Sequence, residues 1–193
     1  MPTPTHTHTH TPTLATQPPR LDLYCHIHKG LRLFMSDTLT RVGRMDLHDA
    51  AERESVLGQV LALLDACRAH VARENTFIHP AMEARRPGAS SGIGAEHDEH
   101  LDAIATLESE VRALTALPQP AGALRLYRRL SRFVAENFEH MLIEETHHNA
   151  TLWEAYTDAE LIGGMPPPAR AGMLQMLAPH LDAKAATRLA AIA

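Results

Sequence analysis

Apolar residues recur every three or four positions through most of the chain, which is the spacing of one face of an α-helix. In the first such stretch Ile27, Leu31 and Phe34 share a face at about 100° per residue, and the pattern stops near Gly43. Segments rich in Pro, Gly and Ser separate the stretches that follow. The spacing predicts four amphipathic helices, over residues 21–44, 49–77, 93–117 and 121–156.

Each predicted helix has one apolar face that has to be buried against the other helices. In the last of the four, this face carries Tyr127, Leu130, Val134, Phe138 and Met141. The connections between the helices are short, so neighbouring helices are expected to run antiparallel. The sequence therefore predicts an all-α fold, an up-down-up-down four-helix bundle.

The two ends of the chain differ from the predicted bundle. Residues 1–20 consist mainly of Thr, Pro and His, with almost nothing to bury, and are expected to form a disordered N-terminal tail. Residues 157–193 contain the break GGMPPP and are expected to form a short C-terminal helical extension, with two short helices around Pro179. The predicted division is thus a tail (1–20), a bundle (21–156) and an extension (157–193).

Composition limits the classes of function. The 193 residues include 18 Lys and Arg against 23 Asp and Glu, with no basic patch, which argues against nucleic acid as a partner. No apolar run in the sequence approaches the roughly 20 residues that span a membrane. Cys25 and Cys67 match no metal-binding or redox spacing and are expected to be reduced core thiols, which indicates a cytoplasmic protein.

Histidine is unusually frequent, with 14 residues, and several lie on the inward faces of the predicted helices. His28 lies at the edge of the apolar face of the first helix. On the second helix His70 and Glu74 are about 40° apart, and both lie within the apolar face. A buried imidazole beside a buried carboxylate is costly unless each has a partner. Either the two satisfy each other, or a cation lies between this helix and its neighbours.

The third and fourth helices repeat the pattern. His97 and His100 occupy core positions of the third, and His140 and Glu144 lie at the margin of the apolar face of the fourth, where Glu145 is expected to point into that face. Every helix thus sends at least one histidine inward, and two helices also send a glutamate. Imidazoles combined with carboxylates that can bridge are typical of a dinuclear metal site. The sequence therefore predicts a metal centre in the core of the bundle.

Several further histidines lie at helix ends, in loops or off the inward faces, and are interpreted as solvated. Two of them, His79 and His148, closely follow the segments that bear predicted ligands, so a ligand role stays open for them, as it does for His100 and Glu145. The histidines interpreted as solvated are His48, His79, His147, His148 and His180.

The order of these motifs resembles the hemerythrin-like, HHE cation-binding family. The resemblance covers about residues 21–156 and rests on His28 and on the segments HVAREN (70–75), EHDEH (96–100) and HMLIEE (140–145). It implies a non-haem centre of two iron ions bridged by two carboxylates. Carried over by motif, the bridging carboxylates are Glu74 and Glu144, and the terminal ligands are His28, His70, His97 and His140.

Two features differ from the oxygen-carrying hemerythrins. The carriers have His-x3-His on the third helix, where this chain has Glu96 and His100, and an aspartate five residues after the last histidine, where this chain has Glu145. The set is closer to the regulatory or repair branch, which implies a protein that reacts with or senses O₂, nitric oxide or peroxide. An iron-binding sensor or donor without turnover is the alternative, and a structural zinc site ranks last because zinc prefers four ligands.

Overall fold

The computed structural model describes residues 20–163, and this part of the chain is helical, with no strand. Two five-residue π-helical turns, η1 and η2, lie within the longer helical stretches. The elements in chain order are α1 (Cys25–Arg44), α2 (Ala50–Arg73), η1 (Glu74–Ile78), α3 (His79–Arg85), α4 (Ser91–Ala116), α5 (Pro120–Ile143), η2 (Glu144–His148), α6 (Asn149–Ala155) and α7 (Asp158–Gly163).

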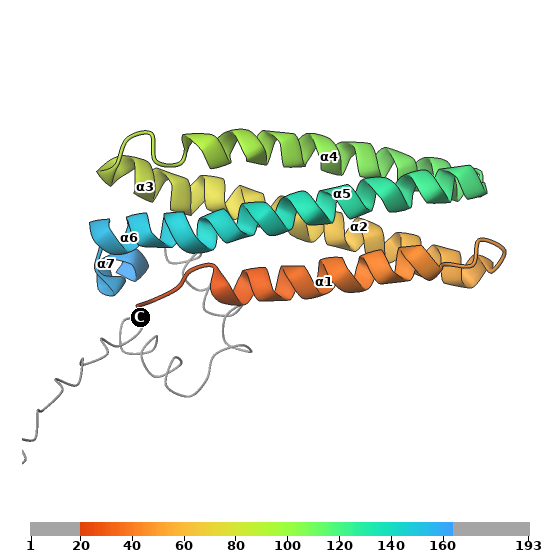
Figure 1. Cartoon of the computed structure of the whole chain (residues 1–193), viewed down its shortest axis with the longest axis horizontal. Helices are drawn as coiled ribbons and strands as arrows, with labels where there is room; N and C mark the ends of the chain where they lie inside the picture. Colours follow the sequence, from red (N-terminus) through yellow and green to blue (C-terminus); the bar gives the residue numbers. More distant parts are fainter. Residues whose placement is uncertain (1–19, 164–193) are drawn as a thin grey trace, which may run out of the picture.

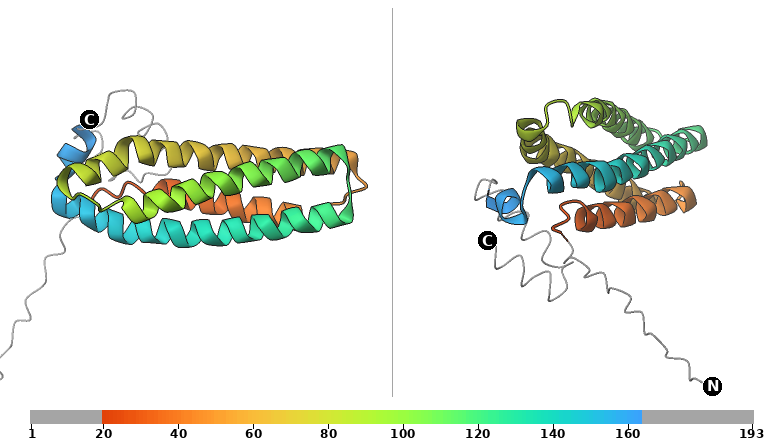
Figure 2. Two further views of the ribbon diagram at one scale, coloured as in Figure 1. Left: turned by 90° about the horizontal axis from the view of Figure 1, so that it is seen from above. Right: turned by 60° about the vertical axis from the view of Figure 1, so that its left-hand side comes forward.

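The long helices lie side by side and alternate in direction (Figure 1). The segments α2–η1–α3 and α5–η2–α6 each form one continuous rod, and the short α7 follows at the end of the second. α1 packs against α2 and α5, and α4 packs against the same two helices, so α1 and α4 are diagonal to each other, as are α2 and α5 (Figure 2). This confirms the predicted all-α, up-down-up-down bundle.

Specific residues set the ends of the helices. The Asp49 side chain accepts hydrogen bonds from two backbone N–H groups in the first turn of α2. Asp22 accepts hydrogen bonds from the N–H groups of Tyr24 and Cys25, so the first helix begins at Cys25, later than the sequence predicted. Gly88 adopts a φ of +87° in the connection between α3 and α4, a conformation that suits glycine because it has no Cβ.

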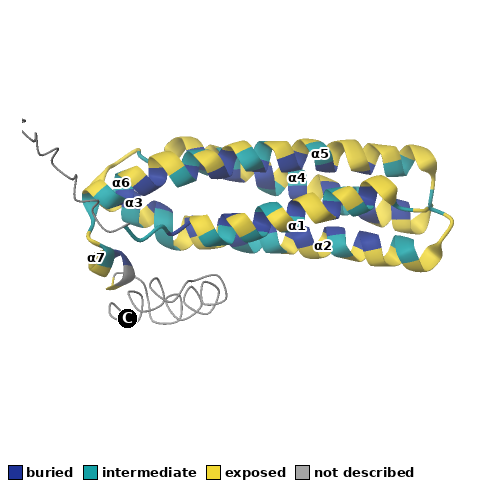
Figure 3. Ribbon diagram, turned by 60° about the horizontal axis from the view of Figure 1, so that its bottom comes forward, coloured by how far each residue is buried: buried dark blue, intermediate teal, exposed yellow. Residues whose placement is uncertain are grey.

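The buried residues lie on the helix faces that are turned toward the inside of the bundle (Figure 3). The larger hydrophobic cluster fills the length that includes Met35, Leu64, Leu107 and Leu130. A smaller cluster closes the opposite end, where the chain enters α1 and leaves α6. Its members are Leu23, Tyr24, Met82, Leu152 and Leu161. Between the two clusters lies a layer of buried histidines and glutamates, which is enclosed on both sides.

The predicted end of the second helix and the predicted burial of two residues were wrong. The second helical stretch does not end before Pro80 but continues to Arg85, because the wide π turn directly before Pro80 accommodates a ring that lacks an N–H. Tyr127 does not face the core but is 38% exposed, with its ring against the backbone of Gly43, because the inward face runs through the preceding residue. Cys25 is exposed rather than buried.

The rod Ala50–Arg85 contains an 18-residue window with a mean hydropathy of 1.2, so by length and composition it could cross a membrane, contrary to the sequence expectation. The core helix of a soluble bundle passes the same test, and 44% of this window is buried against the rest of the protein. The rod is therefore weak evidence for a membrane. Residues 1–19 and 164–193, with most of the predicted tail and extension and with His180, lie outside the described residues.

Candidate metal centre

The six predicted ligands come together in the polar layer. Each is at most 9% exposed, and they come from α1, from α4 and from the two rods α2–η1–α3 and α5–η2–α6. α1 and α4 supply one histidine each, near their starts, and the two other rods supply a histidine and a glutamate each. The six residues are His28 on α1, His70 and Glu74 at the α2–η1 junction, His97 on α4, and His140 and Glu144 at the α5–η2 junction. Their role as ligands stays a prediction.

A π turn begins at each of the two glutamates. The N–H of Glu74 is shared between the carbonyls of His70 and Val71, and Glu144 does the same with the two matching residues of α5. Two residues after each glutamate stands a threonine, Thr76 or Thr146, whose hydroxyl donates to the carbonyl four residues back. Such bonds satisfy carbonyls that the wider turn disturbs. A glutamate followed two residues later by a threonine thus marks the start of a π-helical turn on both diagonal rods.

The first group of ligand atoms joins α1 and α2. Nε2 of His28 lies 3.1 Å from Nε2 of His70. The same atom of His28 lies 3.7 Å from Oε1 of Glu74 and 3.5 Å from Oε2 of Glu144. Two nitrogens bound at right angles to one ion, each about 2.1 Å from it, would be roughly 3 Å apart. The spacing of the two imidazoles therefore fits one metal ion.

The second group joins α4 and α5 in the same way. Nε2 of His97 lies 3.1 Å from Nε2 of His140. It lies 3.4 Å from Oε2 of Glu74 and 3.8 Å from Oε1 of Glu144. Each carboxylate therefore turns one oxygen toward His28 and the other toward His97, which is the arrangement of a bridge between two cation positions.

The nearest donors to the two carboxylates are the imidazoles of the layer: Nε2 of His70 lies 3.2 Å from Oε1 of Glu74, and Nε2 of His140 lies 3.4 Å from Oε2 of Glu144. All four carboxylate oxygens of Glu74 and Glu144 are buried without a hydrogen-bond partner of suitable geometry among the described residues. Two buried carboxylates without donors would carry a large desolvation cost. Cations held between the imidazole pairs would remove that cost, so the residues present fit a metal pair.

Further side chains orient the outer nitrogens of these histidines. Nδ1 of His28 lies 3.1 Å from Oε1 of Glu145, and Nδ1 of His97 lies 2.7 Å from Oδ1 of Asn75. Glu145 and Asn75 each directly follow a glutamate of the centre. In both halves of the centre, therefore, the residue after the glutamate contacts the outer nitrogen of a histidine on another helix. Arg32 pairs with the Glu145 carboxylate. Partners on Nδ1 leave Nε2 directed at the centre.

A third outer contact has no counterpart in the other half within the described part of the chain. Nδ1 of His140 lies 2.7 Å from Oε2 of Glu96, the residue before His97. Sequence reasoning missed the orienting roles of Asn75 and Arg32 and expected Glu145 in the apolar face. In the structure Glu145 instead reaches the outer nitrogen of His28, because η2 turns it toward α1. The signal in the sequence that could have indicated these orienting roles was a polar residue directly after each glutamate, Asn75 after Glu74 and Glu145 after Glu144.

The pKa values in the layer follow its charges. Burial opposes ionisation of His97, but the carboxylates of Glu144 and Glu74 outweigh it and raise the pKa of His97 to about 9. Glu144 likewise raises the pKa of His140 against the effect of burial. Burial would raise the pKa of Glu144, but the imidazoles of His140 and His97 hold it well below its usual value. The carboxylates are thus ionised at neutral pH and attract positive charge.

The described histidines that were interpreted as solvated, together with His100, divide into exposed and buried ones. His48 and His147 are exposed, which confirms the interpretation for these two. The interpretation was wrong for His79 and His148, which are 8% and 3% exposed and lie beside the centre. His100 is also buried, and its ring meets the edge of the His140 ring at a centroid distance of 4.7 Å. His100 belongs to none of the groups of ligand atoms that the described residues form.

Burial keeps these additional histidines neutral. It lowers the pKa of His79 to about 4, with a further contribution from His97, and the pKa of His100 also to about 4, with a contribution from His140. The pKa of His148 is lowered by the same cause. Their imidazoles therefore differ in charge from those of His97 and His140, although the His79 ring contacts His97 and the His100 ring contacts His140.

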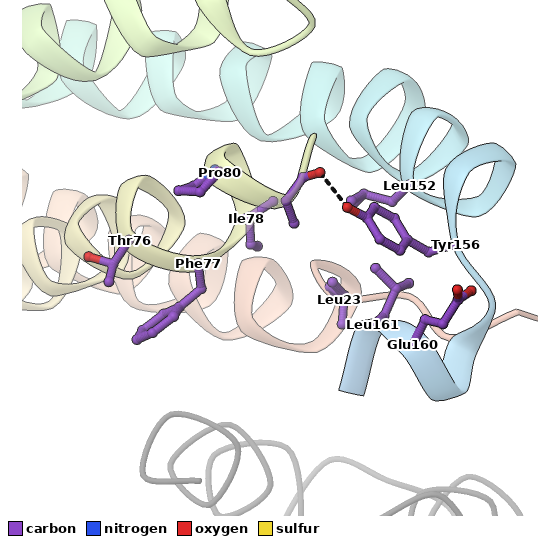
Figure 4. Close-up of a pocket in the computed structure, with 10 residues that line it drawn as sticks. Leu23, Thr76, Phe77, Ile78, Pro80, Leu152, Tyr156, Glu160 and Leu161 are labelled. Carbon is purple, nitrogen blue, oxygen red and sulfur yellow. Dashed lines mark hydrogen bonds between the residues drawn. The ribbon is translucent and has the colours of Figure 1, made fainter. Parts of the chain in front are cut away.

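A pocket of about 500 Å³ lies beside this end of the bundle, between the start of α1, the η1–α3 segment and α6–α7 (Figure 4). Its lining is mainly apolar and includes Ile78 and Pro80, the chain neighbours of His79. Tyr156 donates a 2.7 Å hydrogen bond to the Ala81 carbonyl at its wall. None of the six predicted ligands lines this pocket, so it is separate from the centre.

Comparisons with known proteins agree with this geometry. Curated proteins and solved structures yielded no match to the chain. A family model described as the hemerythrin HHE cation binding domain matches residues 22–150, which include all six predicted ligands and both π turns. This match confirms the resemblance stated from the motifs. The chain therefore belongs to the hemerythrin HHE cation-binding domain family.

Proposed function

We propose that the polar layer holds a carboxylate-bridged pair of iron ions and that the protein reacts with, or senses, O₂, nitric oxide or peroxide. One observation carries the proposal: both buried glutamates belong to both groups of ligand atoms, one around His28 and His70 and the other around His97 and His140, and none of their oxygens has a hydrogen-bond partner of suitable geometry in the described chain. Imidazole and carboxylate together suit iron better than a hard cation such as magnesium.

In this proposal the residues of the chain have distinct roles. Glu74 and Glu144 bridge the two ions from diagonal rods, and the four histidines cap them in pairs, His28 with His70 and His97 with His140. Bound iron would supply redox chemistry and positions at which a small molecule can bind. Asn75 and Glu145 fix the imidazole rings of the α1 and α4 histidines through their outer nitrogens.

The ligand set favours reaction or sensing over reversible oxygen storage. Each ion would take two histidines and a share of two carboxylates, which leaves room at both ions for a small ligand. The third-helix spacing of the carriers is absent, since His100 packs against His140 and Phe133 rather than joining a group of ligand atoms. Because the layer is buried between two apolar clusters, only small molecules should reach it.

A second candidate is an iron-binding sensor or donor without turnover. It is favoured by the position of the layer, because the starts of α1 and α4 and the two π turns all converge on the carboxylates. Metal loading would therefore stabilise one end of the bundle more than the other, and a partner protein could bind selectively to the stabilised form. For either candidate we propose a cytoplasmic protein, in line with two cysteines that form no disulfide.

The test is metal analysis of the purified full chain, followed by reduction under inert gas and addition of O₂, nitric oxide or peroxide in turn. We expect about two iron ions per chain, as for a carboxylate-bridged pair, and a visible spectrum that changes irreversibly with at least one oxidant. Iron that binds but gives no spectral change with any of the three would favour the sensor or donor. A coloured form that appears in air and disappears under vacuum would identify an oxygen carrier and contradict the proposal.

A further inference from the structure

A second pair of buried histidines lies next to the centre, on the side of the smaller hydrophobic cluster. His79 is the first residue of α3, directly after η1, and His148 is the last residue of η2. They come from the two diagonal rods that carry the glutamates, and their rings meet edge to face at a centroid distance of 5.7 Å. Neither is among the ligands that the family resemblance implies.

These two imidazoles share a ligand position with one carboxylate of the centre. One nitrogen from each and one oxygen of Glu144 all lie within 4.8 Å of one another, and all three residues are buried. The group contains two imidazoles from different rods and one carboxylate. This donor set suits a borderline divalent cation such as Fe²⁺, Co²⁺ or Zn²⁺.

An independent observation indicates that the position is built for a ligand. His79 is only 8% exposed, and its Nε2 is buried without a hydrogen-bond partner among residues 20–163. The His79 ring stacks on His97, with centroids 4.9 Å apart and planes at 9°. Phenylalanine would stack equally well without leaving a polar nitrogen unsatisfied. Packing alone therefore does not account for a histidine here.

Tyr24 gives the second imidazole a defined orientation. Its hydroxyl lies 3.2 Å from Nδ1 of His148, and Tyr24 is fully buried within the smaller hydrophobic cluster. This contact engages Nδ1 and leaves Nε2 of His148 as the nitrogen for a cation. A partner on the outer nitrogen is the usual arrangement for a histidine that binds metal, as at His28 and His97 in the same layer.

We propose that His79, His148 and Glu144 form a third cation position, adjacent to the predicted pair and sharing the Glu144 carboxylate with it. The occupant is a divalent transition-metal ion of the borderline class. The proposal needs the Glu144 carboxylate but is independent of which metal the pair holds and of any reaction with an oxidant.

The position should be the weakest of the three. Three divalent cations beside two carboxylates repel one another more than two do, so we expect the third ion to bind at least about tenfold more weakly than the first two. Binding should therefore be stepwise, and a preparation dialysed at low metal concentration should retain the pair alone.

The experiment is equilibrium dialysis of the metal-free full chain against Co²⁺, with metal analysis and a visible spectrum at each concentration. His6, His8 and His10 are replaced by alanine in every sample, so that the Thr-His stretch adds no sites. The test variant carries His79→Phe and His148→Phe, which keep ring volume and stacking but remove both ligand nitrogens. The control is His147→Phe, which removes an exposed histidine next to His148.

The parent and the His147→Phe control should saturate near three Co²⁺ ions per chain, and the double variant near two, with the weakest phase missing. A parent that saturates at two overturns the proposal without any variant. A parent at two with a double variant at one overturns it as well and makes the histidines ligands of the pair. Far-ultraviolet circular dichroism checks that the variants fold, and iron content measured separately tests the proposed function.

Discussion

The two ends of the bundle are built from the same helices but from different chemistry. Toward the α1–α2 connection the interior is a hydrophobic cluster that includes Val60, Leu107 and Leu130, and the surrounding backbone is regular α-helix. Toward the other end the same rods bury histidines and glutamates, and the backbone changes to π-helix at both glutamates.

The difference separates the part of the molecule that maintains the fold from the part that we propose binds metal. Apolar burial needs no partner beyond other side chains, and each buried leucine contributes about 1.5–3 kcal/mol. The buried carboxylates of the polar layer have no hydrogen bond of suitable geometry among the described residues, so their stability depends on positive charge, supplied by protonated imidazoles or by a cation. Changes at the two ends should therefore affect different measurable quantities.

The largest expected effect is on metal content, at the polar end. Glu74→Ala and His70→Ala should each remove most of the iron, because one deletes a bridge and the other a cap. Metal analysis of the purified variants measures this, with His147→Ala as the control that removes an exposed histidine. Full iron content in both variants would show that these residues are not ligands.

At the apolar end the expected effect is on stability. Leu107→Ala should lower the free energy of unfolding by about 2–5 kcal/mol, because Leu107 is 1% exposed within the larger cluster. Iron content per folded chain should stay at the parent value, since Leu107 belongs to no group of ligand atoms. Chemical denaturation gives the first quantity and metal analysis the second. A loss of iron as large as in Glu74→Ala would mean that the two ends are not separable.

A smaller effect distinguishes the two histidines of α4. His97→Ala should cost more iron than His100→Ala, because Nε2 of His97 lies 3.4 Å from Glu74, whereas the His100 ring packs against Phe133 and His140. Side-by-side metal analysis of the two variants checks the order. The reverse order would move the third-helix ligand to the position that the carriers use.

The smallest expected effect is on pH dependence, measured on the chelator-treated chain. The pKa of His97 is raised to about 9, so its stabilising contribution is full below pH 6.5 and is lost as the pH rises toward 9. His79 and His100, with pKa values lowered to about 4, make stability fall as the pH falls from 6.5 toward 4. The thermal midpoint should therefore be highest near pH 6.5.

Metal loading should remove the alkaline part of that loss, because a cation then takes the place of the His97 proton. Thermal unfolding from pH 5 to 9, with and without iron, measures both limbs. His97→Gln should reduce the alkaline limb in the metal-free protein, and His140, whose pKa is also raised, should account for what is left of it. A midpoint that rises steadily from pH 6.5 to 9 without metal would contradict this account of the layer.

The sequence by itself determined the four helices, their antiparallel order and the inward direction of the six predicted ligands. These features depend on the periodicity of side chains along a regular helix, which is a property of the local chain. The spacing of His70 from Glu74 and of His140 from Glu144 lies before each π turn, where a constant step of about 100° per residue is valid. Residue directions could therefore be predicted up to these points.

Only the tertiary structure decided what lies beyond the glutamates. With a constant helical step His79 would point about 140° away from Glu74, but η1 adds a residue to the turn and brings His79 back to the layer. His148 was interpreted as solvated, but it is buried at the end of η2, where the hydroxyl of Tyr24 lies 3.2 Å from its Nδ1. Contacts between residues more than a hundred positions apart, and a change of helical pitch, are not encoded in a local periodic pattern.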